Sequence, residues 1–217
     1  MAASARNAST DQAWNRLLDR LIATRPEHDV QFARIGAGLT DSTDPRLLKL
    51  IPSGLRAAAV LIGLLNPAAE PGILLTVRAG HLRLHAGQIA FPGGVIEAAD
   101  AGPAAAALRE AWEEVGLASS DAQVVGFLPD QIVLTGFRIT PVIAMIADSF
   151  LPRLDPAEVE SCFVLPFAAL LDAANERPGV RNIGGIDVAV RDLQFGEHRI
   201  WGATAGMLFA LRALAQS

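Results

Sequence analysis

The run ALREAWEEVGL, residues 107–117, constrains the fold and the chemistry of this chain more than any other segment. A predicted helix begins at Pro103, because proline is tolerated at the first helical position, and Gly116 marks its end. At 100° per residue, the apolar side chains fall on one face: Leu108, Ala111, Trp112 and Val115. The opposite face carries three carboxylates within an arc of ~100°, because residues three and four apart are neighbours: Glu110, Glu113 and Glu114.

This acidic face is unfavourable for an isolated helix. Glu110 and Glu114 repel each other by about 0.2–0.5 kcal/mol. Glu113 and Glu114 also lie near the negative end of the helix dipole, which costs about 0.3–1 kcal/mol each. One interpretation is a solvated acidic surface. The other is a site for a hard divalent cation, since clustered carboxylates without Cys or His suit Mg²⁺ or Mn²⁺. A local rule broken without compensation points to function.

The composition narrows the function classes. The chain has 217 residues, of which 51% are hydrophobic, so we expect one domain with a sizeable core. The net charge is −5 and Lys49 is the only lysine. We therefore expect no nucleic-acid partner, because a duplex binder needs a basic face. An anionic substrate would need arginines or metal ions.

Cellular location also follows from composition. Cys162 is the only cysteine, so no intrachain disulfide forms, and its apolar neighbours (SCFVLPF) predict a core residue rather than a catalytic thiol. No apolar run reaches the roughly 20 residues that span a bilayer, and the N-terminus lacks the apolar segment of a signal peptide. A cytoplasmic protein without a membrane partner is expected.

Hydrophobic periodicity predicts the elements in a mixed order. We expect strands at 56–65 and 72–78 (a hairpin), 122–128, 137–146, 159–165 and around 186–200. We expect helices at 10–22, 103–116, 167–175 and 203–215. A loop is expected at 129–136, and a polar turn region between the helix 167–175 and residue 186. Residues 1–50 are expected to form an N-terminal extension with a disordered start, followed by a domain at 51–217. The mixed order predicts an α+β fold with a mixed sheet and helices on its faces.

The segment from Ala79 to Gly94 shows no periodicity. Long loops in compact domains are usually functional or disordered. Its Arg, His, Gln and Phe content favours function.

From Gly94 the chain reads GVIEAADAGPAAAALREAWEEVGL, which resembles the Nudix box. The second half matches from Arg109 to Leu117, with Ala111 at the aliphatic position. Asp100 stands where the common box has Glu, and one extra residue lies between it and Arg109.

The preceding stretch, LLTVRAGHLRLHAGQIAFPGG, is similar to the signature of the coenzyme A pyrophosphatase subfamily of Nudix hydrolases. That subfamily tends to carry the longer spacer and an Asp in the box. The matching positions are Leu74, Leu75, Thr76, Arg78, Ala79, Arg83, Gly87, Phe91, Pro92, Gly93 and Gly94. Segments 128–142, 158–167 and 200–206 also look familial, so the resemblance covers about residues 55–210.

The resemblance implies a Nudix α/β/α sandwich in which a loop–helix–loop binds Mg²⁺ or Mn²⁺. The implied metal ligands are Glu110, Glu113, Glu114 and the Gly93 carbonyl. Arg109 would orient the loop or the carboxylates, or be structural. Asp100 and Glu97 would pair with Arg109.

The implied reaction is hydrolysis of the diphosphate bond of coenzyme A or acyl-CoA. The general base is Glu110 or Glu158, although an ordinary exposed carboxylate explains Glu158 equally well. The implied substrate-binding residues are Arg78, Arg83, Gly87 and Gln88, because guanidinium groups bind phosphate bidentately. His81 and His85 alone read as surface residues, and Phe91–Pro92 and Trp201–Gly202 as structural ones.

Other readings stay open. The substrate could be ADP-ribose, NADH or a nucleoside triphosphate. The chain could instead be a non-catalytic Nudix-fold binding module, which would be expected to lose box carboxylates. Residues 1–50 could form a homodimer contact, cover the substrate or lengthen the domain.

Overall fold

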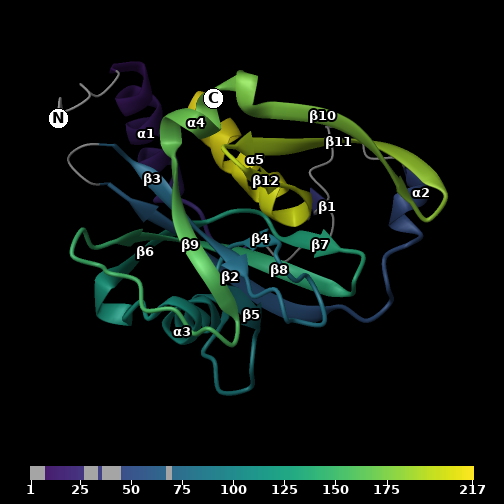
Figure 1. Ribbon diagram of the computed structural model, residues 1–217, viewed down its shortest axis with the longest axis horizontal. Helices are drawn as coiled ribbons and strands as arrows, with labels where there is room; N and C mark the ends of the chain where they lie inside the picture. Colours follow the sequence, from purple (N-terminus) through teal and green to yellow (C-terminus); the bar gives the residue numbers. More distant parts are fainter. Residues whose placement is uncertain (1–7, 27–33, 36–44, 67–69) are drawn as a thin grey trace.

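The structure is a computed structural model that describes residues 8–26, 34–35, 45–66 and 70–217 (Figure 1). Within these residues, nine strands form the main sheet: β1 (Arg34–Ile35), β2 (Arg56–Leu65), β3 (Gly72–Arg78), β4 (Ile89–Ala90), β5 (Gly93–Val95), β6 (Ala122–Phe127), β7 (Gln131–Val133), β8 (Phe137–Ile146) and β9 (Val159–Pro166).

The sheet is mixed, as predicted. Its path is β1-β7-β8-β2-β3-β4, and β5, β6 and β9 pair with β2, β8 and β3 respectively. β2 runs parallel to β8 along its whole length and antiparallel to β5. The expected β2–β3 hairpin pairs only at its base, through Leu64–Ile73 and Leu65–Gly72. On its other edge β3 pairs with β9 along its whole length.

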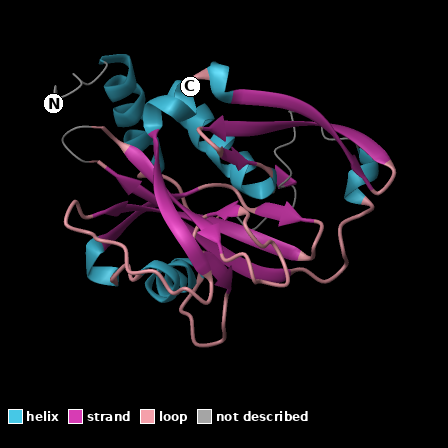
Figure 2. Ribbon diagram, in the orientation of Figure 1, coloured by secondary structure: helices cyan, strands magenta, loops and turns pink. Residues whose placement is uncertain are grey.

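Helices cover both faces of the sheet (Figures 1 and 2). α1 (Ala8–Leu21), α4 (Phe167–Leu171) and α5 (Gly202–Gln216) pack on one face, and α3 (Pro103–Val115) packs on the other. The period-two pattern of β2 supplies both cores, because Ile62 and Leu64 face the first layer while Ala59 and Leu61 face α3. The sequence-predicted α/β/α sandwich is confirmed.

A second, antiparallel sheet lies against α5. It consists of β10 (Glu176–Ile183), β11 (Ile186–Phe195) and β12 (His198–Ile200). The prediction of a polar turn region before residue 186 is wrong, because β10 pairs with β11 over its full length. The short helix α2 (Pro45–Leu48) packs through Leu47 against Ile186 and Val188 of this hairpin.

The predicted helix 10–22 is α1, which buries Trp14, Leu17 and Leu21. The start predicted to be disordered comprises residues 1–9, of which residues 1–7 lie outside the described residues. Ala8 and Ser9 already belong to α1, so for them the prediction is wrong. The predicted helix 167–175 is shorter, since α4 ends at Leu171 and a 3₁₀ turn follows at Ala173–Asn175. The unperiodic segment 79–94 contains β4 and the start of β5, and the predicted loop 129–136 contains β7. Among the described helices, none combines the length and apolarity that crossing a bilayer requires.

Candidate active site

Helix α3 turns a different face to the sheet than the apolar pattern predicted. Its buried side chains are Ala106, Ala107, Ala111, Glu114 and Val115. Trp112 is 49% exposed, whereas Glu114 is only 2% exposed. The physical reason is the short distance between the helix and the sheet. Small alanine side chains let α3 pack closely on β2 and β5, whereas a buried indole would keep the helix further away. Trp112 instead lies on the outside, where the Arg153 guanidinium carbon lies 5.4 Å from its ring centroid.

The predicted helix end is confirmed. Gly116 adopts the left-handed conformation, with φ 71°. Its N–H donates to the Trp112 carbonyl at 3.0 Å, and the Leu117 N–H donates to the Ala111 carbonyl at 3.2 Å. A glycine at this position avoids the steric cost that a Cβ would add.

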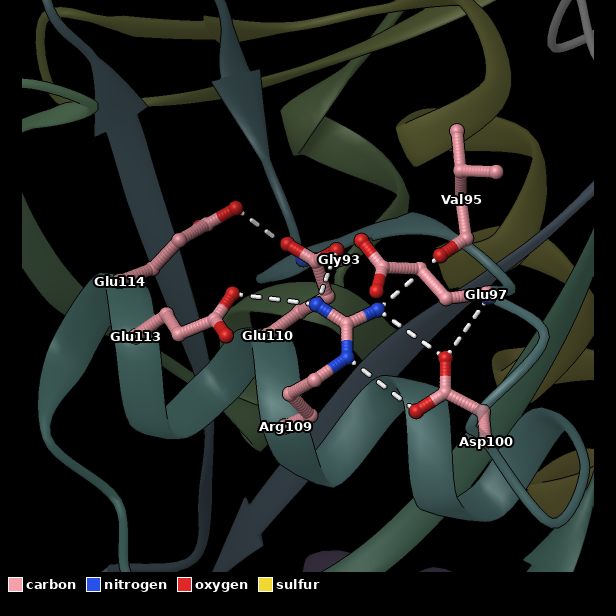
Figure 3. Close-up of polar contacts among 8 residues, drawn as sticks. All are labelled: Gly93, Val95, Glu97, Asp100, Arg109, Glu110, Glu113 and Glu114. Carbon is pink, nitrogen blue, oxygen red and sulfur yellow. Dashed lines mark hydrogen bonds and ion pairs between the residues drawn. The ribbon is translucent and has the colours of Figure 1, made fainter.

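Arg109 ties the preceding loop to the helix (Figure 3). Its Nε and Nη2 donate to the two carboxylate oxygens of Asp100, each at 3.1 Å, and Nη2 also donates to the Val95 carbonyl at 3.1 Å. Its Nη1 donates to Glu110 at 2.9 Å and to Glu113 at 3.1 Å. The predicted pairing of Asp100 with Arg109 is therefore present.

These contacts also set the charge state of Asp100. The hydrogen bonds from Arg109, and then from the Glu97 N–H at 2.8 Å, lower the pKa of the Asp100 carboxyl. Asp100 is therefore held as a carboxylate, and Glu97 contributes through its backbone rather than its side chain. Because Arg109 bonds to the loop and to two helix carboxylates, it positions the predicted ligands relative to one another.

The buried Glu114 side chain points toward Gly93, the first residue of β5 (Figure 3). Its Oε1 accepts a hydrogen bond from the Gly93 N–H at 3.3 Å. Burial raises the pKa of Glu114 to about 7, and the negative charges of Glu158 and Glu110 add to this effect. The Gly93 N–H and the positive charge of Arg78 oppose it without cancelling it. A buried carboxylate with so little compensation is unfavourable for folding.

Glu110 is in a similar position. Burial is the main cause of its raised pKa; Arg109 opposes the rise, and the charges of Glu113 and Glu158 add to it. Gly94 makes room for this side chain, because a Cβ at Gly94 would collide with the Glu110 carboxylate. The glycine pair before the box therefore has distinct roles, since a Cβ at Gly93 would instead come within 2.7 Å of the Val60 Cα.

The three box carboxylates do not converge on one point. In the parts of the chain that the structure describes, no three Asp, Glu, His or Cys side chains lie closely enough together to hold a metal ion. Glu110 and Glu113 face Arg109, while Glu114 faces Gly93. The donor set nevertheless fits a hard divalent cation, because the ligands are all oxygens. Burial, which raises the pKa values of Glu110 and Glu114, also disfavours their charged forms unless a positive charge is close.

The part of the signature stretch between β3 and β4, residues 79–88, is called the signature loop, and backbone hydrogen bonds close it at its base. The Arg78 N–H donates to the Gln88 carbonyl at 2.9 Å, and the Gly87 N–H donates to the Arg78 carbonyl at 3.0 Å. The neighbouring Ala79 N–H donates to the Glu158 carbonyl, also at 2.9 Å. The loop base is thus fixed beside the start of β9.

This arrangement brings some predicted residues together and leaves others apart. Arg78 and Glu158 act electrostatically on Glu114. The buried Arg78 Nε has no hydrogen-bond partner in the part of the chain that the structure describes. Arg83 and Gly87 lie exposed in the loop, and of these two the Gly87 N–H contacts the Arg78 carbonyl. Gln88 is held by His85, whose Nδ1 lies 2.9 Å from its Oε1.

Cys162 is half-buried beside the α3 core, and burial raises the pKa of its thiol. A raised pKa disfavours the reactive thiolate. The geometry agrees with a packing role.

The Val95 carbonyl is a contact that the sequence did not predict, because any residue type supplies a carbonyl and no side-chain signal marks it.

Comparison with known proteins gives consistent matches. The NUDIX domain family matches residues 54–183. A Shigella flexneri protein named "Uncharacterized Nudix hydrolase NudL" is 40% identical over 157 residues, covering 72% of this chain and 81% of the relative. A protein of the same name from Salmonella paratyphi B is 42% identical over 160 residues, covering 70% and 79%. A solved MutT/nudix family protein from Enterococcus faecalis shares the fold, with a TM-score of 0.50 and 12% identity over 99% of this chain and 76% of that one.

Proposed function

Because the chain belongs to the Nudix hydrolase family, we propose that it hydrolyses the diphosphate bond of coenzyme A or an acyl-CoA. The products would be 3′,5′-ADP and 4′-phosphopantetheine or its acyl form. Hydrolysis of a pyrophosphate bond in a nucleotide derivative follows from the family. The choice of coenzyme A is the finer step and rests on the signature loop.

The observation that carries this proposal is the position of Arg78. It is the last residue of β3 and belongs to the signature stretch, and its charge acts directly on Glu114 of the box helix. Among the described residues its buried Nε has no hydrogen-bond partner, which leaves a donor that a phosphate oxygen would satisfy. The signature and the box are thus parts of one site.

Members of this family generally use a divalent cation such as Mg²⁺ or Mn²⁺. In this chain the proposed ligands are Glu110, Glu113, Glu114 and the Gly93 carbonyl. Bound cations would neutralise phosphate oxygens and lower the pKa of a water molecule. Glu110 and Glu113 would then exchange their bonds to Arg109 for bonds to the cation. Arg109 would keep its bidentate contact with Asp100, so the loop would stay in place.

The protein groups supply positioning, charge and proton transfer. Arg78 and Arg83 bind the diphosphate, and Gly87 and Gln88 hold the loop around the substrate. The oxygen of a water molecule forms a bond to one phosphorus, and the bond from that phosphorus to the bridging oxygen breaks. The bridging oxygen leaves on the other phosphate. Glu110 or Glu158 accepts the proton of the water.

Two other functions compete with this one. Hydrolysis of ADP-ribose, NADH or a nucleoside triphosphate would use the same carboxylates and differ only in the contacts of the signature loop. A non-catalytic binding module would have no need for Glu114, whose buried carboxylate is costly. Retention of all three box carboxylates favours an enzyme.

The test is a product assay by chromatography, with coenzyme A, ADP-ribose and NADH as parallel substrates in MgCl₂ or MnCl₂. A Glu114→Gln variant removes the central carboxylate, and Glu70→Gln, at an exposed position, is the matched control. We expect metal-dependent 3′,5′-ADP from coenzyme A that is lost only in Glu114→Gln. Cleavage of ADP-ribose but not coenzyme A would refute the substrate assignment and keep the chemistry. No cleavage of any substrate would favour the binding module.

A further inference from the structure

A buried carboxylate in the second sheet fixes two arginines at the surface. Asp192 of β11 is 4% exposed. Its Oδ1 accepts from Arg181 Nη2 at 3.1 Å, and its Oδ2 accepts from Arg199 Nε at 2.8 Å and Arg199 Nη2 at 2.6 Å. The Arg199 side chain is 65% exposed despite these bonds. Two guanidinium groups are thus held in place while part of each stays accessible.

An exposed indole completes this cluster. Trp201 directly follows β12 and is 37% exposed, and the Arg181 guanidinium carbon lies 4.7 Å from its ring centroid. Arg199 and Trp201 alternate with the buried Ile200, so they share the face of β12 that points away from the core. We call Arg181, Asp192, Arg199 and Trp201 the arginine–tryptophan cluster.

The arginine–tryptophan cluster adjoins the segment that forms the active site. α5 begins immediately after Trp201, and Thr204 Oγ1 in its first turn donates to the Ile89 carbonyl of β4 at 3.1 Å. β12 also contacts β4 (Figure 1). β4 connects the signature loop, which ends at Gln88, to the glycine pair beneath Glu110 and Glu114. The elements that carry Arg199 and Trp201 therefore contact the strand that leads into the candidate active site.

A purely structural role does not account for both arginines. Arg181 alone would pair the Asp192 charge, and a bridge from a largely exposed arginine adds little to stability. Two guanidinium groups against one carboxylate leave an excess positive charge in a chain whose net charge is −5. Fixed guanidinium groups bind phosphate bidentately, and an accessible indole stacks on a planar base.

We propose that the arginine–tryptophan cluster binds the 3′-phosphoadenosine end of the substrate. Arg199, supported by Arg181, binds the 3′-phosphate, and Trp201 stacks on the adenine. This inference rests on the proposed function, because a 3′-phosphate distinguishes coenzyme A from ADP-ribose and NADH. The cluster would thereby set substrate specificity, whereas the α3 carboxylates carry out the hydrolysis.

The test measures binding of 3′,5′-ADP and of 5′-AMP by titration calorimetry in EDTA. Neither ligand contains a diphosphate bond, so neither can be hydrolysed by the proposed reaction. Arg199→Gln removes the phosphate donor. Arg177→Gln is the control, because Arg177 is an exposed arginine of the same sheet that bonds only to the backbone carbonyls of Ala174 and Glu176 among the contacts described. We expect Arg199→Gln to weaken 3′,5′-ADP about tenfold or more, as for loss of a charge-assisted hydrogen bond, and to leave 5′-AMP unchanged.

A second variant covers the case in which Arg199→Gln fails to fold. Arg199→Lys keeps the positive charge but cannot bind phosphate in a bidentate manner. We therefore expect a smaller loss of 3′,5′-ADP affinity than in Arg199→Gln, and an unchanged thermal midpoint. Wild-type affinity for 3′,5′-ADP in either folded variant would overturn the inference.

Kinetics then separate this inference from the proposed function. A raised KM for coenzyme A with an unchanged kcat in Arg199→Gln supports both. An unchanged KM would refute the proposed role of the arginine–tryptophan cluster and would not affect the proposed hydrolysis of coenzyme A. If the wild type does not cleave coenzyme A but 3′,5′-ADP binding still depends on Arg199, the proposed substrate is wrong and the phosphoadenosine site stands.

Discussion

Replacing Glu114 by Gln should make the metal-free protein more stable at neutral pH while abolishing its activity. The Glu114 carboxyl is buried against β5, and burial raises its pKa from the ordinary 4.5 to about 7. The native state therefore holds this proton more tightly than the unfolded chain does. Stability of the wild type is undiminished below pH 4.5, falls as the pH rises from 4.5 to 7, and stays constant above about 8.

The size of this effect follows from the same pKa values. A rise from 4.5 to about 7 corresponds to ~3 kcal/mol of unfolding free energy lost at pH 8. At pH 5 most of that loss has not yet occurred, so the wild type should lose ~2 kcal/mol between pH 5 and pH 8. Glutamine has no charge to bury. Its own costs, such as an unsatisfied amide N–H, are the same at both pH values and cancel in the comparison.

The assay is urea unfolding in EDTA at pH 5 and pH 8, followed by circular dichroism, for wild type, Glu114→Gln and the control Glu70→Gln. We expect the stability of Glu114→Gln relative to wild type to rise by ~2 kcal/mol between the two pH values, with no such rise in the control. Added MgCl₂ should then stabilise the wild type and not the variant. A pH-independent difference between Glu114→Gln and wild type would refute the reasoning.

Three further predictions follow from the same geometry. Arg109→Lys cannot make the bidentate contact with Asp100 in the loop. We expect kcat to fall about 100-fold, because small misplacements of positioning groups have effects of this order. A steady-state assay with coenzyme A measures this fall, and a wild-type kcat would contradict the prediction. Gly94→Ala should fold normally but displace the Glu110 carboxylate, whereas Gly93→Ala should destabilise the fold because its Cβ meets the backbone of β2. Thermal melts and Mg²⁺ titrations of the two variants separate these effects. Equal thermal midpoints for the two variants would contradict this prediction. Cys162→Ala should keep wild-type kcat and should be no more resistant to alkylating agents than the wild type, because burial keeps the thiol protonated near pH 7. Loss of kcat in a folded variant would show that the thiol takes part in the reaction.

The sequence correctly predicted the helices and strands whose formation depends mainly on residues that are close together in the chain. The runs at 56–65, 72–78 and 137–146 are apolar, β-branched and bounded by turn residues, and each is a strand with those bounds. Pro103 and Gly116 bound α3 because their backbone preferences are intrinsic to the residue type.

Elements whose stability comes from distant partners were missed. β10 has the sequence ERPGVRNI, which is polar and contains Pro and Gly, and it is a strand because all eight of its residues pair with β11. The two-residue β4 and three-residue β5 depend likewise on β3 and β2. No local pattern of that length separates a strand from a loop.

The sequence by itself determined the three clustered carboxylates, the helix that carries them and the family to which the chain belongs. It did not determine which of the three is buried, because an apolar pattern placed Trp112 inward, whereas close packing of alanines on β2 turned Glu114 inward instead. Nor did it place Arg78 beside Glu114, or Arg181 and Arg199 on Asp192. Those contacts join residues far apart in the chain or on different strands, and only the pairing and packing of the sheets bring them together.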